Sequence, residues 1–553
     1  MRLWSRSKEL GVCATSLAPI CDSPSQTPVM SSNPNATTAR QDDLASMKTE
    51  VGQIARGAGL GLGGNVLYYF LNFLFTVLVA RLVGAEAFGL YTLGVTTVTL
   101  LSRFSVMGLD RGAIRYVSIK RRAGDGGAIR QVILTSILIG LGVSITVALL
   151  LAFFPEFFLQ LFRWRDKTYL LTLFPVFALA LPAMVMVSIG VAGTQAFRTM
   201  RYRALIPNTL IPLTKLLGAV ALFFVLGVTA LTPTIAFAVA QIVGGVLALY
   251  FLFRLARRYT HPMQGNTAWE PGLTRELLVY SFPLLLSSVL VYLNGRTEIM
   301  VLGIYHQADA SGIYNAAMRF ATLPLMVLTA FNAIFMPVIA DLHHRGEMQR
   351  LDALFKLVTR WVIMVAMPIL LALFLYAEAF IGFFGRDFAT GVIVLRILSL
   401  STLINFSTGS VGVMLLMTGY SNLALFNAFL TLLVALALDF LLIPTFGITG
   451  AAVAGMLSLI VVNLVNLGEV RYLLRIQPYN RRTLRPFIAA IPAAIGGWLL
   501  TRWVPVTGLL SLAWASALVA GVYFGGLMVL GWDDEDRMMF AALSKRFRRL
   551  LGR

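Results

Sequence analysis

Charged side chains are scarce in this sequence. Asp, Glu, Lys and Arg make up only 13% of its 553 residues, whereas about a quarter of a soluble globular protein is charged. Hydrophobic residues account for 58% of the chain, and the mean hydropathy is +0.80. So few charges cannot cover the surface of a chain of this size in water. We therefore expect an integral membrane protein whose apolar surface faces the lipid bilayer.

Cysteine and the common catalytic motifs are also nearly or wholly missing. The only two thiols, Cys13 and Cys21, lie close together and form neither a disulfide framework nor a C-x-x-C metal motif. The G-x-x-x-x-G-K-[ST] phosphate-binding loop is absent, which argues against ATP as the direct energy source. We expect no cofactor, no metal and no catalytic residue, and hence a protein that is not an enzyme.

Long apolar runs recur along most of the chain. A helix needs about 20 mostly apolar residues to cross the hydrocarbon core. Applied to this sequence, that length predicts an all-α polytopic membrane protein with about fourteen transmembrane helices. They are expected at residues 58–80, 88–108, 131–154, 169–193, 205–227, 230–253, 277–303, 311–338, 354–377, 389–417, 421–444, 447–472, 484–504 and 508–531.

The two ends of the chain differ from this apolar body. Residues 1–55 are rich in Ser, Thr, Asn, Pro and Ala and lack periodicity, so we predict a disordered cytoplasmic tail. No stretch of it has the pattern of a signal peptide, and a translation start at Met30 or Met47 stays open. Residues 532–553 predict a basic amphipathic cytoplasmic tail that lies on an anionic leaflet.

The net charge of +20 is distributed unevenly over the predicted loops. With the N-terminus placed in the cytoplasm, most Lys and Arg residues fall on the cytoplasmic side, as the positive-inside rule requires. Both termini are then cytoplasmic, and the charge follows from membrane topology rather than from a nucleic-acid partner. The few basic residues on the outer side are Arg81, Arg163, Arg165, Lys167, Arg386 and Arg502.

Two short sequences recur at nearly the same spacing and indicate an internal repeat. The segment from Ala85 to Tyr91 matches the segment from Ala308 to Tyr314, which lies 223 residues later. Gly227-Val228-Thr229 matches Gly447-Ile448-Thr449 at an offset of 220 residues. Six helices return the chain to its starting side, so the two units are parallel. Parallel repeats in transporters enclose a substrate site between the halves, and we expect a central cavity there.

These features predict six segments along the chain. Two six-helix lobes form the centre, and two additional transmembrane helices follow them. The segments are the tail at 1–55, the N-terminal six-helix lobe at 56–255, a cytoplasmic linker at 256–276, the C-terminal six-helix lobe at 277–475, the two additional helices at 476–531 and the basic tail at 532–553.

Four motifs, in order along the chain, carry a family resemblance. They are Arg81-Leu82-Val83-Gly84-Ala85-Glu86-Ala87-Phe88-Gly89-Leu90-Tyr91, Tyr280-Ser281-Phe282-Pro283-Leu284-Leu285-Leu286-Ser287, Gly312-Ile313-Tyr314 with Arg319, and the run from Ile443 to Ala454. Over residues 55–475 the chain resembles the polysaccharide-export flippases of the multidrug/oligosaccharidyl-lipid/polysaccharide exporter superfamily. The resemblance implies two lobes around a cavity and a polyprenyl-pyrophosphate-linked oligosaccharide as substrate. It also implies a bacterial inner membrane location and an association with other polysaccharide assembly proteins.

Several charged residues fall inside the predicted helices, where each is costly to insert and is therefore a functional candidate. Guanidinium pairs well with phosphate oxygens, so we predict that Arg296, Arg319, Arg396 and Lys215 line the cavity and bind the pyrophosphate or sugar. Glu298 and Asp439 are candidates for ion coupling. Arg103 is close enough to a helix end to extend to the headgroups.

Structural alternatives remain for some of these residues. Glu298 could instead form an ion pair with Lys215 or Arg319. Arg296 and Glu298 are two residues apart, so on a regular helix they point in nearly opposite directions and cannot pair with each other.

Alternative functions also remain open at this point. An ion-coupled multidrug or cation antiporter of the same superfamily is one, although it would want acidic residues in the cavity. A non-transporting membrane scaffold of a polysaccharide assembly complex is another. A membrane-bound polymerase or transferase is disfavoured because the predicted outer loops are short.

Overall fold

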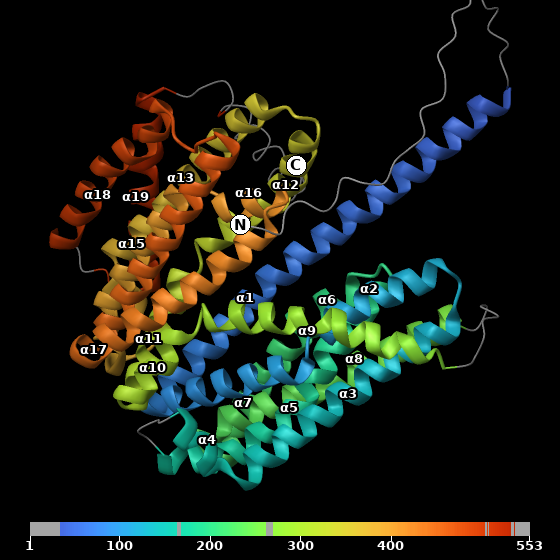
Figure 1. The fold of residues 1–553 in the computed structure, drawn as a ribbon. Helices are drawn as coiled ribbons and strands as arrows, with labels where there is room; N and C mark the ends of the chain where they lie inside the picture. The colour runs from blue at the N-terminus through green and yellow to red at the C-terminus, as the bar shows by residue number, and fades with distance from the viewer. Residues whose placement is uncertain are drawn as a thin grey trace, which may run out of the picture. The chain divides into compact units, whose positions relative to one another are not determined.

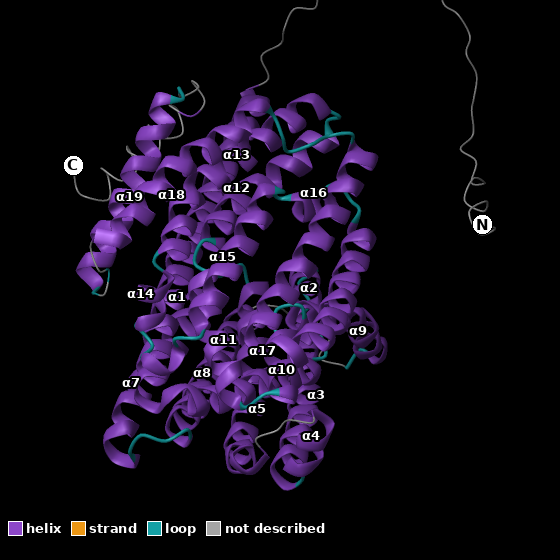
Figure 2. Cartoon of the chain, turned by 90° about the vertical axis from the view of Figure 1, so that its left-hand side faces the viewer, coloured by secondary structure: helices purple, strands orange, loops and turns teal. Residues whose placement is uncertain are grey.

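The structure, a computed structural model, describes residues 34–162, 167–260, 269–503, 506, 508–531 and 536, with side chains from Gly64 onward. The chain divides into two units, Met1–Arg56 and Gly57–Arg553. Everything below concerns the second unit unless stated otherwise. The described residues form helices, turns and loops without a strand, as Figure 2 shows by its colours. This confirms the predicted all-α fold class.

Nineteen α-helices and three short helices of other types follow one another along the described chain. They are α1 (Pro34–Val106), α2 (Leu109–Arg122), α3 (Gly126–Phe153), α4 (Pro155–Phe162), α5 (Lys167–Ala196), α6 (Arg201–Leu205), the π-helix η1 (Ile206–Leu210), α7 (Ile211–Leu226), α8 (Leu231–Thr260), α9 (Pro271–Leu293), α10 (Thr297–Tyr305), α11 (Ala308–Ala321), α12 (Leu325–His344), α13 (Met348–Leu375), α14 (Ala377–Gly382), the 3₁₀ helix η2 (Arg386–Phe388), α15 (Gly391–Ser407), α16 (Val411–Met417), α17 (Ser421–Leu474), the 3₁₀ helix η3 (Arg481–Leu484), α18 (Arg485–Trp503) and α19 (Leu509–Val529).

Eleven helical segments of the described chain are long and apolar enough to cross a membrane, which makes this a multi-pass membrane protein. A twelfth is obtained when α15 and α16, bent by 43° at their junction, are counted as one span. Two of the eleven, Gly64–Arg122 and Ser421–Leu474, contain 59 and 54 residues, enough for two crossings each. Counting those two segments twice gives the fourteen crossings expected from the sequence, and that exact number stays a prediction.

Both of the very long segments are broken at a glycine. Gly84 has φ +81° and ψ 177°, and Gly447 has φ +56° and ψ −132°, so neither residue is helical. A side chain is strained at positive φ, which is why glycine occupies both turns. Gly227, at the C-terminus of α7, has φ +78°. Gly227 and Gly447, which the sequence matched as repeat equivalents, therefore both end a helix in a conformation that favours glycine.

Three predicted spans are interrupted rather than continuous. The span predicted at 277–303 consists of α9 and α10, which are separated at Asn294-Gly295-Arg296. The span predicted at 311–338 consists of α11 and α12, and the one at 389–417 of α15 and α16. Asn-Gly is a strong turn signal in any sequence, and it places Arg296 at a break within the second lobe's first span.

The terminal segments differ from the expectation or lie outside the described residues. α1 begins at Pro34, so residues 34–55 are helical where a disordered tail was predicted. Ala, Leu, Met, Lys and Glu, all good helix formers, are present between Leu44 and Glu50 and explain the difference. Residues 1–33 lie outside the described residues. So does the predicted amphipathic tail at 532–553, except for Asp536.

The helices form two lobes, which Figure 1 shows as a blue-to-green group and a yellow-to-orange group. In the first lobe α5 packs on α3 and α8, and α8 packs on α7. In the second lobe α15 packs on α11, α13 and α17, and α17 also packs on α10. The final pair, α18 and α19, packs on α13 of the second lobe. This pairing agrees with two helical bundles followed by two added helices.

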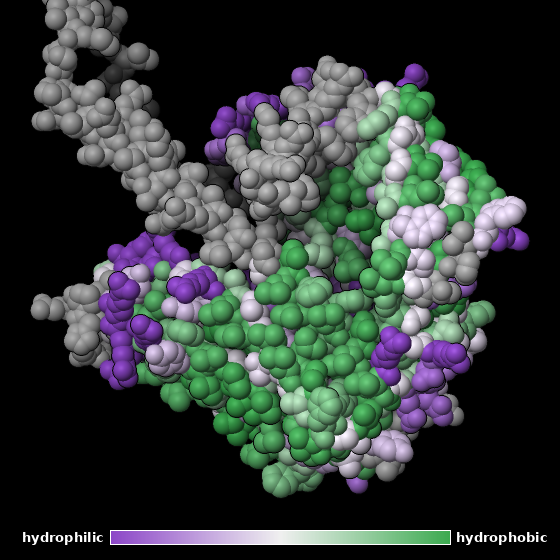
Figure 3. All heavy atoms as spheres, turned by 180° about the vertical axis from the view of Figure 1, so that it is seen from behind, coloured by the Kyte–Doolittle hydropathy of each residue, from purple (hydrophilic) through white to green (hydrophobic). Residues whose placement is uncertain are grey.

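The apolar surface and the buried hydroxyl groups fit a lipid environment. Figure 3 shows one face with a broad apolar area and hydrophilic side chains gathered at its margins. Inside the helices, Thr and Ser hydroxyls donate to the carbonyl four residues earlier, as Thr76 does to Asn72 and Thr96 does to Thr92. Such bonds satisfy polar groups within one helix where no water is at hand.

Candidate functional site

The two copies of the repeated motif contact each other reciprocally. A Cβ placed on Gly89 would lie 1.7 Å from the backbone oxygen of Ala308. A Cβ placed on Gly312 would lie 2.5 Å from the backbone oxygen of Ala85. Gly89 is equivalent to Gly312 and Ala85 to Ala308, so the same contact is made twice, once in each direction. We call this pair of contacts the glycine crossing; no side chain fits at either glycine without separating the lobes.

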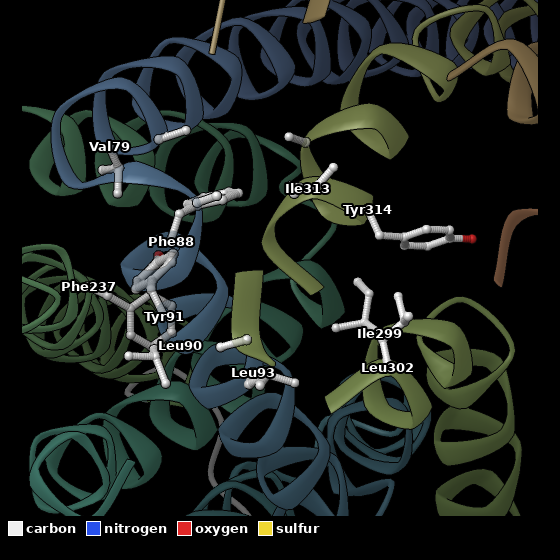
Figure 4. Close-up of a cluster of buried hydrophobic side chains, with 14 of the residues drawn as sticks. Val79, Phe88, Leu90, Tyr91, Leu93, Phe237, Ile299, Leu302, Ile313 and Tyr314 are labelled. Atoms are coloured by element: carbon white, nitrogen blue, oxygen red, sulfur yellow. The ribbon is translucent and has the colours of Figure 1, made fainter. Parts of the chain in front are cut away.

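The residues beside the glycine crossing continue this pairing. The Asn315 amide Nδ2 donates to the hydroxyl of Thr92 at 3.1 Å, and these two positions are also repeat equivalents. The equivalent tyrosines diverge instead, as Figure 4 shows: Tyr91 lies against Phe237 of the first lobe, whereas Tyr314 points away into the second lobe. The crossing lies at the end of the lobes that carries the turn at Gly84, which we call the Gly84 end.

A cavity of about 400 Å³ lies next to the glycine crossing. The first lobe contributes most of its lining, from α1, α5, η1, α7 and α8, and the second contributes residues of α9 and α11 with Arg296 between α9 and α10. Among the described lining residues are four cations and no Asp or Glu. The cations are Arg103, Lys215, Arg296 and Arg319.

Lys215 is held in place by neutral groups. Its ammonium donates to the Asn72 side-chain oxygen at 2.6 Å and lies 4.2 Å from the centroid of the Phe75 ring. A ring face attracts a cation and an amide oxygen accepts its hydrogen bond, but neither neutralises the charge. The ion pair between Lys215 and Glu298 that the sequence left open is not present among the described residues.

Arg296 and Arg319 both line the cavity. Arg296 precedes the first residue of α10, and Arg319 lies in the last turn of α11. The Nε of Arg319 is buried without a hydrogen-bond partner among the described residues. Arg319 interacts electrostatically with Arg296, and Lys215 interacts electrostatically with Arg319. Arg296 donates through Nη1 to the Asn315 side-chain oxygen, but at 3.5 Å this bond is long. Three like charges within interaction range favour a polyanion between them.

The break between α9 and α10 separates a half that contacts both lobes from a half that packs within the second lobe. α9 packs on α2 and α3 of the first lobe and also on α17 of the second, and a Cβ on Gly108 would lie 2.3 Å from the Ser281 backbone oxygen. α10 packs on α11 and α17 of the second lobe. Arg296, which caps α10 with φ −143°, therefore stands where the span passes from one lobe to the other.

Sequence reasoning missed several residues of this cavity. Arg103, expected to extend to the headgroups, lines the cavity instead. The polar residues Asn72, Gln241, Tyr292 and Asn315 line it too, and the Tyr292 hydroxyl donates to the Thr96 carbonyl at 2.9 Å. Uncharged polar residues inside apolar spans were the available signal, and Asn315 could have been found from its repeat equivalence to Thr92.

Glu298 and Asp439 are not among the residues that line the cavity, although Glu298 interacts electrostatically with Arg296 of the lining. Both are buried, with exposed fractions of 9% and 0%, and their carboxyl groups interact electrostatically with each other. Glu298 lies against Gly455 of α17, where a Cβ would be 2.8 Å from its Oε1. Neither oxygen of Asp439 has a hydrogen-bond partner of good geometry among the described residues, although the Thr297 side chain is close enough to interact with the carboxyl group. The second lobe thus encloses a pair of carboxyl groups, here called the carboxyl pair.

Arg396 was predicted to line the same cavity, and this is corrected by the structure. It is not among the residues that line the cavity between the lobes; its Nη2 is 3.4 Å from Glu378 Oε1 and its Nε is 3.4 Å from the Phe374 carbonyl oxygen. Residues from α13, α14, α15 and α18 surround it in a second cavity. The sequence alone does not show which face of α15 points toward the cavity between the lobes.

Comparison with known proteins gives this arrangement a family. Residues 54–343, more than half of the chain, match the family described as "Polysaccharide biosynthesis protein". The chain is 25% identical over 355 residues to the succinoglycan biosynthesis transport protein ExoT of Rhizobium meliloti, covering 63% of this chain and 66% of that protein. It is 24% identical over 185 residues to the probable low-salt glycan biosynthesis flippase Agl15 of Haloferax volcanii, covering 33% of this chain and 39% of that one. The matches thus span about two fifths to two thirds of these relatives.

Solved structures show a related fold at low identity. The lipid II flippase MurJ in an inward closed conformation has a TM-score of 0.67 and 16% identity, covering 85% of this chain and 98% of that one. A multidrug resistance MATE family transporter of the MOP superfamily, in an inward-facing conformation, has a TM-score of 0.62 and 14% identity, covering 74% and 94%. The two lobes, which meet at a repeated motif beside a cationic cavity, thus share the fold of these two solved structures, and the chain belongs to the polysaccharide biosynthesis protein family.

Proposed function

We propose that this protein moves a lipid-linked saccharide across the membrane, taking a polyprenyl-pyrophosphate-linked oligosaccharide from the cytoplasmic to the outer leaflet of a bacterial inner membrane. The observation that carries this proposal is the cavity between the lobes, with four cations and no described carboxylate in its lining. A pyrophosphate offers several oxygen acceptors and more than one negative charge, which suits guanidinium groups. The family match and the flippases among the relatives support the same substrate class.

The cationic lining bears on the alternatives. Four cations repel a cationic drug and attract an anion, so the lining favours a pyrophosphate-linked substrate over a multidrug or cation antiporter. A non-transporting scaffold has no need for cations that are buried in the membrane at a cost. The proposal therefore assigns substrate binding to Lys215, Arg296 and Arg319, with Arg103 added from the structure.

Alternating access supplies the proposed movement. The glycine crossing closes the Gly84 end by direct backbone contact between the lobes. Under the topology inferred from the basic residues, the Gly84 end faces outward, so the arrangement described here would correspond to a state closed to the outside. Parting of the glycine crossing would open the cavity outward, with the break at Asn294-Gly295-Arg296 allowing α9 and α10 to move with different lobes.

We further propose that the carboxyl pair couples this movement to an ion. Support comes from the burial of Glu298 and Asp439 and from the unpartnered oxygens of Asp439. Two buried carboxyl groups in mutual interaction bind a proton or a small cation more readily than either would alone. They lie in the second lobe and outside the cavity lining, so an ion there would act on lobe arrangement without touching the saccharide.

The test uses purified protein in liposomes loaded with a fluorescent polyprenyl-pyrophosphate oligosaccharide. The measured quantity is the rate at which the sugar becomes accessible to a reagent in the opposite leaflet. We expect protein-dependent translocation that falls to the protein-free rate in the Arg296→Ala/Arg319→Ala double variant. Arg350→Ala is the matched control, because Arg350 is a largely exposed arginine paired with Glu347 outside the cavity.

Size-exclusion and thermal unfolding profiles must match the parent protein before rates are compared. Full translocation by the double variant would remove the cationic cavity from the mechanism. Absence of translocation for several lipid-linked sugars, with and without a proton or sodium gradient, would move the function to an antiporter or a scaffold.

A further inference from the structure

A second cavity, larger than the one between the lobes, lies at the Gly84 end. Its volume is about 920 Å³. It is bounded by the C-terminal end of α13, by α14 and α15, and by the facing ends of α18 and α19, with Arg81 of α1 at its edge. The proposed transport function makes no use of this cavity, which is lined by Arg396, the residue that was predicted to line the cavity between the lobes.

The cavity carries two cations that are poorly neutralised. Arg396 is 3.4 Å from Glu378, longer than a typical charge-assisted hydrogen bond, and the Glu378 side chain is 79% exposed, so water weakens this pair further. Arg81 is exposed and has no ion pair with any described residue. Glu378 is the sole acidic residue of the described lining, so two guanidinium groups face one screened carboxylate.

A third donor lies deep in the same cavity. Tyr376 is only 2% exposed, and its hydroxyl is buried without a hydrogen-bond partner among the described residues. The hydroxyl lies close to α18, since a Cβ on Gly497 would be 3.3 Å from it. A buried hydroxyl without a partner is costly, and an acceptor supplied by a ligand would remove that cost.

Most of the remaining lining is apolar, and part of it is exposed. Phe374, Trp498 and Leu509 have exposed fractions of 42%, 50% and 67%. Trp498 also supports Arg502, whose guanidinium carbon is 4.8 Å from the ring centroid. Trp and Arg near the end of a membrane helix are typical of the level of the lipid headgroups. The cavity therefore offers cationic and phenolic donors and an apolar wall at the depth where a headgroup meets its chains.

We propose that this cavity binds the phosphate of a membrane lipid, with Arg81 and Arg396 holding the phosphate oxygens and the lipid chain lying along Trp498 and Leu509. Guanidinium donates two parallel hydrogen bonds to phosphate, and the Tyr376 hydroxyl, which is buried in the wall, can add a third once neighbouring side chains shift. A soluble anion would gain nothing from the apolar wall, and an uncharged lipid would leave both arginines unsatisfied.

Because the two arginines belong to different lobes, a lipid bound by both would influence the arrangement of the lobes. Arg81 belongs to the first lobe and Arg396 to the second. A phosphate held by both would bridge the lobes and stabilise the arrangement in which the glycine crossing is closed. A ligand shifts an equilibrium by its difference in affinity for the two states, so this lipid would favour closure of the Gly84 end.

The experiment measures binding rather than transport, so its result is independent of the proposed function. Purified full-length protein, stripped of lipid in detergent, is titrated with phosphatidylglycerol, with phosphatidylcholine and with polyprenyl phosphate, and bound lipid is counted by native mass spectrometry. We expect saturable binding of phosphatidylglycerol, polyprenyl phosphate or both. We expect phosphatidylcholine to bind at least about tenfold more weakly, because its ammonium group would face the two arginines.

The variants locate the site. Arg81→Ala/Arg396→Ala should weaken anionic lipid binding at least about tenfold, and Tyr376→Phe about threefold, which removes one hydroxyl and keeps the packing. Arg350→Ala, at the opposite end of the second lobe, should bind as the parent does. Binding of only one anionic lipid identifies the source of the phosphate and supports the proposal. Equal binding by the parent and both variants, or no preference for anionic lipids, would overturn it.

Discussion

The two six-helix repeats put opposite chemistry at equivalent positions. Counting 223 residues on from Phe75 leads to Glu298, and 220 residues on from Ala219 leads to Asp439. In the first lobe these positions are apolar and fully packed, with exposed fractions of 2% and 0%. Phe75 there presents its ring to the ammonium of Lys215. In the second lobe the same positions hold the carboxyl pair.

The comparison shows which features of a repeat are kept and which diverge. Backbone features persist, since the glycine crossing uses both copies of one motif and the turns at Gly227 and Gly447 both have positive φ. Side-chain chemistry has separated, with cations facing the cavity and carboxyl groups enclosed in the second lobe. Among the described residues no ion pair joins the two groups, although Glu298 still interacts electrostatically with Arg296.

The largest expected effect comes from breaking the feature that the repeats share. In Gly89→Ala the new Cβ would lie 1.7 Å from the Ala308 backbone oxygen, so the lobes cannot close at the Gly84 end. We expect translocation in the liposome assay to fall more than about tenfold, because a transporter that cannot reach one of its two states cannot cycle. Gly312→Ala should act in the same way through Ala85.

Spin labels report the same change directly. With Cys13 and Cys21 replaced, labels at Glu86→Cys and Asp387→Cys should give a longer mean distance in Gly89→Ala than in the parent. Gly142→Ala is the control, because no atom lies within 4 Å of a Cβ at that position. Unchanged distances together with full translocation in Gly89→Ala would contradict the glycine crossing as a closure contact.

The second prediction concerns the carboxyl pair, which the second lobe has and the first lobe lacks. Under the proposed ion coupling, Glu298→Gln removes one charge of the carboxyl pair with almost no change of shape. We expect translocation to lose its dependence on a proton or sodium gradient. The rate measured without a gradient should stay within about threefold of that of the parent protein. Glu347→Gln is the control, because Glu347 lies at the N-terminus of α13 and its side chain is 37% exposed. An intact gradient dependence in Glu298→Gln would exclude this residue from coupling.

A smaller effect is expected when Asp439 is replaced by its first-lobe equivalent. Asp439→Ala removes two buried oxygens that lack hydrogen-bond partners, whose burial costs about 1–3 kcal/mol. Part of this gain is offset by lost packing, so we expect a free energy of unfolding raised by about 1 kcal/mol. Scanning fluorimetry in detergent at neutral pH measures the shift against Asp341→Ala, an exposed control. A clear loss of stability would mean that Asp439 has a stabilising partner in the folded protein.

The smallest effect concerns the ring beneath Lys215. Phe75→Leu removes a cation–π contact worth about 0.5–2 kcal/mol but leaves the hydrogen bond from Lys215 to Asn72. We expect the substrate concentration for half-maximal translocation to rise about twofold, with an unchanged maximal rate. Phe177→Leu is matched in size and burial and does not line the cavity. An equal rise in that control would assign the effect to packing alone.

The sequence predicted the architecture better than the positions of individual side chains. Apolar length and the repeated motif were enough to predict the helical fold and two lobes, because both depend on composition and spacing. Lys215, Arg296 and Arg319, expected in a cavity because a charged residue inside a span is costly, do line the cavity between the lobes; their role in binding stays a proposal.

The sequence did not show how each helix is rotated about its axis, nor where a predicted span is interrupted. Arg396 was assigned to the wrong cavity, because nothing local shows which face of α15 points inward. Arg103 was assigned to the headgroups, because its distance from a helix end is equally consistent with a cavity reaching that depth. The break at Asn294-Gly295 was overlooked within an otherwise apolar run, although the dipeptide is a turn signal.

The glycine crossing also bears on ancestry. In two separate copies of one six-helix unit related by a twofold axis, every off-axis contact would occur twice. If one residue of the first copy contacts a second residue of its partner, the partner makes the same contact in return. Gly89 against Ala308 and Gly312 against Ala85 follow that pattern within a single chain. Fusion of such a pair frees each half to mutate alone, yet a bulkier residue at either glycine would disrupt the contact by itself. Both glycines are thus expected to stay fixed while their neighbours drift apart.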